Sequence, residues 1–127
     1  MSKSPIYKSF AYAFKGISFA WKERNFKLHV LSMCLVIAAG FYFEISKTDW
    51  CLVLLCIGAV MSLEVMNTAL EKTVDRISLE RHPELGKIKD LSAAAVLLFS
   101  IMALVIGLLI FVPYVNETFF ENVRHCH

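Results

Sequence analysis

Three carboxylates and an amide recur at helical spacing within one short stretch of the chain. At positions i, i+3, i+7 and i+11 stand Glu64, Asn67, Glu71 and Asp75. At about 100° per residue these side chains fall within about 80° of one another, which makes a single stripe on one helix face. Like charges this close repel one another, so a site that holds them needs a cation. Oxygen ligands of this kind suit Mg²⁺, especially Mg²⁺ carried by a nucleotide.

Glu64 follows directly after an uncharged apolar run, Trp50 to Leu63. That run is too short to cross a bilayer alone, since a membrane helix needs about 20 residues. The residues after Glu64 stay apolar on most sides, so we expect the helix to continue and to hold Glu64 near one membrane interface. Ionisable residues at membrane depth are costly and usually functional. A solvated helix face is a competing interpretation for Asp75, because Arg76 and Lys72 are near it.

The elements that must position this stripe are membrane spans. The 127 residues are 57% hydrophobic, with a mean hydropathy of +0.60, which favours a single membrane domain, 1–127. Two more uncharged runs, Leu28 to Phe43 and Leu91 to Asn116, flank the first. We predict spans over about 28–44, 49–77 and 90–114. The four cysteines form no C-x-x-C pair, so neither a metal site nor a disulfide framework is predicted from them.

The segment before the first span has a different pattern. Ser4 as cap and Pro5 as first helical residue predict a helix start. Apolar residues then follow a period of about 3.6, while three lysines recur every seventh residue on the opposite face. These lysines are Lys8, Lys15 and Lys22. The pattern predicts an amphipathic helix over about 4–24 that lies in the membrane surface, although a core-facing helix of a soluble protein has the same periodicity.

Basic residues predict the orientation of the spans. Of the 13 Lys and Arg residues, 11 either precede the first span or lie between the second and the third. They are Lys3, Lys8, Lys15, Lys22, Arg24, Lys27, Lys72, Arg76, Arg81, Lys87 and Lys89. Since cytoplasmic loops carry the excess of Lys and Arg, the N-terminus and the carboxylate stripe are predicted to be cytoplasmic and the C-terminal tail external.

A second polar segment, Glu80 to Asp90, lies on the same side. Pro83 and Gly86 predict a short loop here. Lys87 and Lys89 either contact phosphate or anchor the loop at the membrane. Asp90 would be the first residue of the third span. A negative charge at a helix N-terminus interacts favourably with the helix dipole, so a structural role for Asp90 is also open. The chain has no G-x-x-x-x-G-K-[ST] loop and no protein-kinase motifs, so a common soluble ATP-binding fold is excluded.

Taken together, the motif Glu64-x-x-Asn67-Thr-Ala-x-Glu71-x-x-x-Asp75, with Lys89-Asp90 and Ala94 after it, resembles the signature of the prokaryotic diacylglycerol kinase and undecaprenol kinase family. The resemblance covers the surface helix, the three spans and both loops. It implies an all-α integral membrane protein of the bacterial inner membrane that assembles as a homotrimer. It also implies transfer of the γ-phosphate of Mg-ATP to a lipid hydroxyl, in phospholipid biosynthesis, with no nucleic-acid partner.

The resemblance also implies roles for individual residues. Glu64 would be the general base for the lipid hydroxyl, and Glu71 and Glu23 would bind the metal. Asn67 and Asp75 would support the site. Nucleotide contacts would come from Tyr12, Glu80, His82, Lys89 and Asp90. The segment from Glu23 to His29 is more similar to the undecaprenol kinase branch, so undecaprenol is the favoured lipid and diacylglycerol the alternative.

Two other classes of protein remain open on the residues alone. A cation or proton transporter subunit would also use an intramembrane carboxylate stripe, but it would not need the Lys89-Asp90 segment. A structural membrane protein with a charged seam would tolerate Glu64→Gln. A lipid kinase is favoured because the stripe, the basic segment and the surface helix occur together on one side.

Overall fold

The computed structural model describes residues 5–78, 80 and 82–126, and in these residues the regular structure is entirely α-helical. Its helices are α1 (Ile6–Ala20), α2 (Arg24–Tyr42), α3 (Lys47–Ile77) and α4 (Pro83–His125). Of these, α2, α3 and α4 are long and apolar enough to cross a membrane. The predicted all-α class is therefore confirmed, three helices have the length and composition expected of the predicted spans, and α3 runs through Glu64 without a break.

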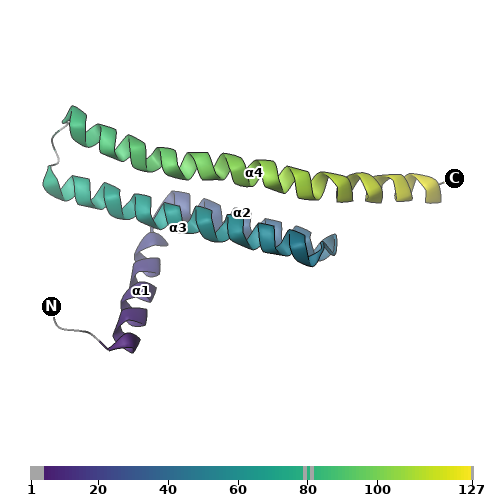
Figure 1. The fold of residues 1–127 in the computed structure, drawn as a ribbon, viewed down its shortest axis with the longest axis horizontal. Helices are drawn as coiled ribbons and strands as arrows, with labels where there is room; N and C mark the ends of the chain where they lie inside the picture. Colours follow the sequence, from purple (N-terminus) through teal and green to yellow (C-terminus); the bar gives the residue numbers. More distant parts are fainter. Residues whose placement is uncertain (1–4, 79, 81, 127) are drawn as a thin grey trace.

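The three long helices lie side by side, with α3 in contact with both α2 and α4 (Figure 1). The shorter α1 projects from one side of this bundle at a steep angle, with its C-terminal end near the long helices (Figure 1). The 43 residues of α4 make a helix about 65 Å long, roughly twice the thickness of a bilayer core. It runs past the start of α3 toward the C-terminus (Figure 1). We call the end with residues 43–46 the turn end, and the opposite end, where α3 ends at Ile77 and α4 begins at Pro83, the carboxylate end.

The predicted loop over Glu80 to Asp90 is wrong for most of its length. Helix α4 begins at Pro83, Gly86 donates a hydrogen bond to the His82 carbonyl oxygen at 3.0 Å, and Asp90 lies two turns inside the helix. The reason is that proline fits the first turn of a helix, where its missing N–H has no intrahelical partner to lose. Proline therefore begins a helix here. Asp90 thus does not open the helix.

The start of α1 also differs from the prediction. Pro5 is the residue before the helix, with an extended ψ of 149°, and Ile6 is the first helical residue. The predicted cap, Ser4, lies outside the described residues, as do two of the counted basic residues, Lys3 and Arg81. The helix ends at Ala20, and residues 21–23 form the turn into α2.

The turn end is held together by close packing and by a polar clamp. Glu44 takes a left-handed φ of 50° in the tight connection between α2 and α3. Ser46 caps α3 by accepting a hydrogen bond from the Asp49 N–H at 3.1 Å. The Tyr114 hydroxyl of α4 donates to Asp49 at 3.1 Å and accepts from the Ser46 N–H at 3.3 Å. A small apolar core of Ile45, Val53 and Ile110 lies beside this clamp.

Gly40 permits the close approach of α2 to α3 at this end. A Cβ atom at this position would lie 2.7 Å from Cη2 of Trp50 and 2.8 Å from its Cζ2. We expect Gly40→Ala to lower the free energy of unfolding by about 1–3 kcal/mol, because the indole must move out of its place. Unfolding by SDS in mixed micelles measures this. Gly58→Ala is the matched control, because a Cβ atom there meets nothing within 4 Å. Equal stability of the two variants would contradict the packing argument.

Candidate active site

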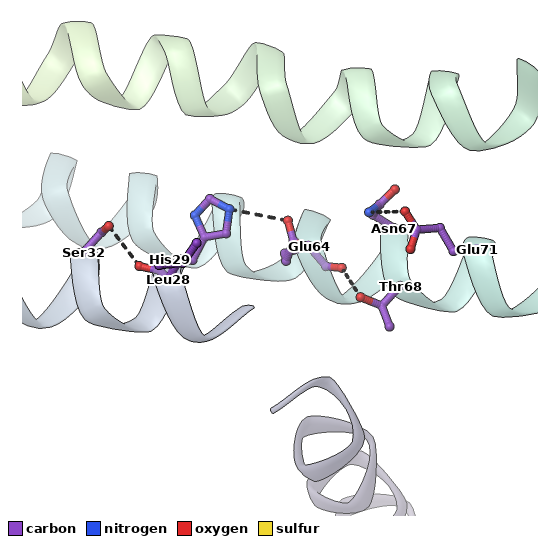
Figure 2. A network of polar contacts seen from close by, with 7 residues as sticks. All are labelled: Leu28, His29, Ser32, Glu64, Asn67, Thr68 and Glu71. Atoms are coloured by element: carbon purple, nitrogen blue, oxygen red, sulfur yellow. Dashed lines mark hydrogen bonds and ion pairs between the residues drawn. The ribbon is translucent and has the colours of Figure 1, made fainter. Parts of the chain in front are cut away.

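Glu64 is the first residue of the carboxylate stripe and is deeply buried, with 4% of its surface exposed. Figure 2 shows the imidazole of His29, on α2, directed across to the Glu64 carboxylate on α3. The distance from His29 Nε2 to Glu64 Oε2 is 3.4 Å. The Glu64 backbone carbonyl accepts a hydrogen bond from the Thr68 hydroxyl at 3.1 Å. A buried carboxylate is costly unless it is paired, so this contact explains how α3 tolerates Glu64 within an apolar stretch.

Asn67 and Glu71 continue the same face of α3. Asn67 Nδ2 donates to Glu71 Oε1 at 3.2 Å (Figure 2), and Asn67 is 6% exposed. Its other amide atom, Oδ1, is one of two buried side-chain N or O atoms without a hydrogen-bond partner in the described part of the chain. A buried polar atom normally has a hydrogen-bond partner, and a bound ligand would supply one for this oxygen. The stripe therefore presents a free amide oxygen beside a carboxylate.

Glu23 approaches the stripe from the turn between α1 and α2. Its carboxylate lies 3.7 Å from Nζ of Lys72 on α3. Both Glu23 and Glu71 are close enough to Glu64 for their charges to act on it. The ion pair is largely solvent-exposed and contributes little stability. It places the Glu23 carboxylate beside α3 next to Lys72.

Metal binding requires more ligands than these side chains supply. Among the residues that the structure describes, no group of three or more His, Cys, Asp or Glu side chains could hold a metal ion. The Glu71 carboxylate and the free oxygen of Asn67 lie side by side on α3, whereas the Glu23 carboxylate is paired with Lys72. Such a partial set fits Mg²⁺ delivered on a nucleotide, because Mg²⁺ commonly takes one or two protein carboxylates and completes its shell with phosphate oxygens and water.

A polar pocket of about 410 Å³ lies at the carboxylate end, between the last turn of α3 and the first turns of α4. Asp75 and Lys89 line it and form an ion pair that joins the two helices. Glu80 and His82 also line it, with a loose contact of 3.9 Å between them. Asp75 is 11 residues from Glu64, which is about 16 Å along the helix. Glu71 lies between them, one turn from Asp75.

An apolar groove of about 460 Å³ lies on the other side of Glu64, among α2, α3 and α4. Apolar side chains from all three helices line most of it, including Val36, Ile57 and Phe111. His29 also lines this groove, so a single imidazole contacts both the groove and the buried carboxylate. The groove, Glu64 and the polar pocket therefore follow one another along α3.

The predicted site residues are not all brought together. Glu23, Glu64, Asn67 and Glu71 gather on one face of α3, and Asp75, Glu80, His82 and Lys89 gather at the polar pocket. Tyr12 is 60% exposed on α1, and Asp90 is exposed on α4. Neither makes a side-chain hydrogen bond or ion pair with another of these residues within the described ranges. Lys87 does not line the pocket and pairs with Glu84 on the exposed face of α4 at 3.4 Å.

Sequence reasoning gave no role to His29, because a lone histidine near a membrane interface is unremarkable. The contact with Glu64 joins two helices, and no spacing within one helix encodes it. The same holds for Lys72, whose partner Glu23 precedes α2. The one available signal was the need of a buried carboxylate for a partner, which pointed to a basic or polar group without identifying it.

Comparisons with known proteins match most of this chain. The family model for prokaryotic diacylglycerol kinase matches residues 11–111. The chain is 44% identical over 109 residues to the undecaprenol kinase of Bacillus subtilis (strain 168), covering 85% of this chain and 89% of the relative. It is 32% identical over 101 residues to the diacylglycerol kinase of Escherichia coli (strain K12), covering 79% and 83% of the two chains. The matched region includes the carboxylate stripe, the groove and the polar pocket.

Proposed function

This chain belongs to the prokaryotic diacylglycerol kinase family and is a lipid kinase, and from that premise we propose that it transfers the γ-phosphate of Mg-ATP to the hydroxyl group of undecaprenol. The observation that carries the proposal is the position of Glu64. This carboxylate is buried between an apolar groove that suits a lipid tail and a polar pocket that suits a nucleotide.

Glu64 is the general base in this proposal. Its carboxylate accepts the proton of the lipid hydroxyl as that oxygen attacks the γ-phosphorus. The new bond is P–O to the lipid, the broken bond is P–O to the β-phosphate, and ADP leaves with the electron pair. Phosphoryl transfer needs little covalent chemistry from the protein, so positioning and charge stabilisation are the main contributions. Burial of Glu64 keeps water away from the base, which disfavours transfer of phosphate to water.

The polar pocket is the proposed nucleotide site. Lys89, held by Asp75, provides a positive charge for the phosphates at the point where the pocket meets the stripe. Glu80 and His82 line the outer part of the pocket and are placed to contact the nucleoside. Asp90 and Tyr12 remain proposed nucleotide contacts on the basis of the family resemblance. A triphosphate extended along α3 from Asp75 would bring its γ-phosphate toward Glu71.

Glu71 and Glu23 are the proposed metal ligands, with the free oxygen of Asn67 beside them. Bound Mg²⁺ would offset the negative charge of the carboxylates and of the phosphates. Lys72 pairs with Glu23, and Asn67 donates to Glu71. The Asn67 contact orients the Glu71 carboxylate.

Undecaprenol is preferred to diacylglycerol for two reasons. The Bacillus subtilis relative, at 44% identity, is named an undecaprenol kinase, whereas the Escherichia coli relative, at 32%, is named a diacylglycerol kinase. The groove is also long and apolar, with residues of α4 from Ser100 to Phe111 along one side. An apolar wall of this kind suits an isoprenoid chain.

The assembly and its place in the membrane belong to the same proposal. We expect a homotrimer in the bacterial inner membrane, with the carboxylate end cytoplasmic and the C-terminus external. Helix α1 would lie in the interface with its apolar side chains in lipid. These side chains, among them Phe10, Phe14 and Ile17, are at least half exposed in the single chain, which agrees with contact to lipid or to a neighbouring subunit.

Kinetics with two acceptors test the proposed lipid. Detergent-purified protein is given Mg-ATP with either undecaprenol or diacylglycerol at equal mole fraction in the same micelles. We expect kcat/KM to be roughly 10- to 100-fold higher for undecaprenol, the range that apolar fit alone supplies. A preference for diacylglycerol would contradict the assignment of the lipid and leave the kinase activity intact.

A further inference from the structure

The contact between His29 and Glu64 goes beyond the roles described above. We infer that His29 is a positioning residue, which fixes the Glu64 carboxylate at the inner end of the apolar groove so that one oxygen faces the lipid hydroxyl. This inference rests on the proposed function, because it assigns Glu64 as the base. The contact joins α2 to α3 and is drawn in Figure 2.

The surroundings of Glu64 leave His29 as the partner of its side chain within the described residues. The Thr68 hydroxyl donates to the backbone carbonyl of Glu64 and not to its carboxylate. The Asn67 amide, one turn along, donates to Glu71. His29 Nε2 is the nitrogen within 3.4 Å of Glu64 Oε2. Without this contact the Glu64 side chain could adopt several rotamers. Restricting it to the one rotamer needed for catalysis would then cost conformational free energy.

The position of His29 suits this task. Its side chain is 28% exposed, while the side chain of Glu64 is 5% exposed. The imidazole therefore forms part of the groove wall and also contacts the carboxylate behind it. The approach of Nε2 to Oε2 at 3.4 Å has the geometry of an ion pair and is longer than an ordinary N–H···O hydrogen bond. Oε1 then remains to accept the proton of the lipid hydroxyl, which passes the imidazole as it leaves the groove.

Two substitutions separate a polar role of His29 from a packing role. His29→Gln keeps a polar N–H group at about the reach of imidazole Nε2, whereas His29→Leu keeps bulk and loses the polar group. We expect His29→Leu to lower kcat by about 10- to 100-fold, because the buried Glu64 carboxylate loses its polar partner. His29→Gln should stay within about fivefold of the wild type. The KM for ATP should not change in either, because the nucleotide pocket is at the other end of the stripe.

A double-mutant cycle tests whether His29 acts through Glu64. In a Glu64→Gln background, His29→Leu should cost less than about threefold, because the base it positions is already absent. An equal loss in both backgrounds, a change confined to the KM for ATP, or full activity of His29→Leu would overturn the inference. His125→Leu, at the far end of α4, is the control for histidine loss and should behave as the wild type.

A spectroscopic measurement keeps the inference testable apart from catalysis. In protein labelled with ¹⁵N-histidine, the Nε2 signal that disappears in His29→Leu is assigned to His29. We expect this signal to move in Glu64→Gln and to remain in place in Glu44→Gln. A signal that does not respond to Glu64→Gln would overturn the contact itself. Absence of phosphate transfer by the wild type, with the signal responding as expected, would instead count against the proposed function.

Discussion

Glu64→Gln is expected to lower kcat for lipid phosphorylation by about 10²- to 10⁴-fold, the usual contribution of a general base. The substitution keeps the size of the side chain and its contact with His29, and it removes the proton acceptor. The KM for ATP should be nearly unchanged, because the nucleotide pocket lies about 16 Å away along α3. Initial rates with labelled ATP in mixed micelles measure both constants.

The fold of the Glu64→Gln variant should not suffer. A buried carboxylate costs more to desolvate than a neutral amide of the same shape, and functional sites often sacrifice stability, so the free energy of unfolding should be equal to or above that of the wild type. Glu44→Gln is the matched control, since Glu44 is an exposed glutamate at the turn end and takes no part in the site. Loss of activity in Glu44→Gln, or activity of Glu64→Gln within about threefold of the wild type, would contradict the role of Glu64.

Lys89→Met is expected to raise the KM for ATP by about 10- to 100-fold, since it removes a charge-assisted contact to phosphate from the polar pocket. The change also leaves Asp75 without its partner, which adds an unpaired negative charge beside the phosphates. The fold-decrease in kcat should be smaller than the fold-increase in the KM for ATP, because groups near Glu71 still hold the γ-phosphate in this proposal. Initial rates at saturating lipid, with ATP varied, measure the two effects separately.

Lys87→Met is the matched control for this experiment. Lys87 lies two residues away on the same helix, but its side chain pairs with Glu84 on the exposed face and does not line the pocket. A surface change of this kind should leave the KM for ATP within about twofold of the wild type. Equal effects of the two substitutions would mean that general positive charge at the membrane surface matters, and not the pocket.

Those features of the fold that depend on local patterns were predictable. Three spans followed from runs of uncharged residues, and the continuation of α3 past Glu64 followed from the apolar residues around the stripe. The shared face of Asn67 and Glu71 followed from helical spacing and is confirmed by their hydrogen bond. The start of α4 was predicted wrongly, because Pro83 and Gly86 indicate a loop unless proline is the first residue of the helix.

Features that depend on two helices at once were not predictable from spacing. His29 contacts Glu64 because α2 and α3 pack with a particular relative rotation and offset. That relative placement cannot be predicted from the residue pattern of either helix alone. The groove has the same origin, since its walls come from three helices. The positions of Tyr12 and Asp90 relative to the site stay predictions, because the proposed trimer would place further surfaces beside them.

The most direct test of the central claim follows the label of the nucleotide. Purified protein is incubated with undecaprenol and Mg-ATP labelled in either the γ- or the α-phosphate, and the lipid is extracted. The account predicts that the γ-label, and not the α-label, enters the lipid with wild-type protein, and that Glu64→Gln loses nearly all of this transfer. Folded wild-type protein that leaves undecaprenol and diacylglycerol both unlabelled, or a Glu64→Gln variant that transfers label as well as the wild type, would contradict it.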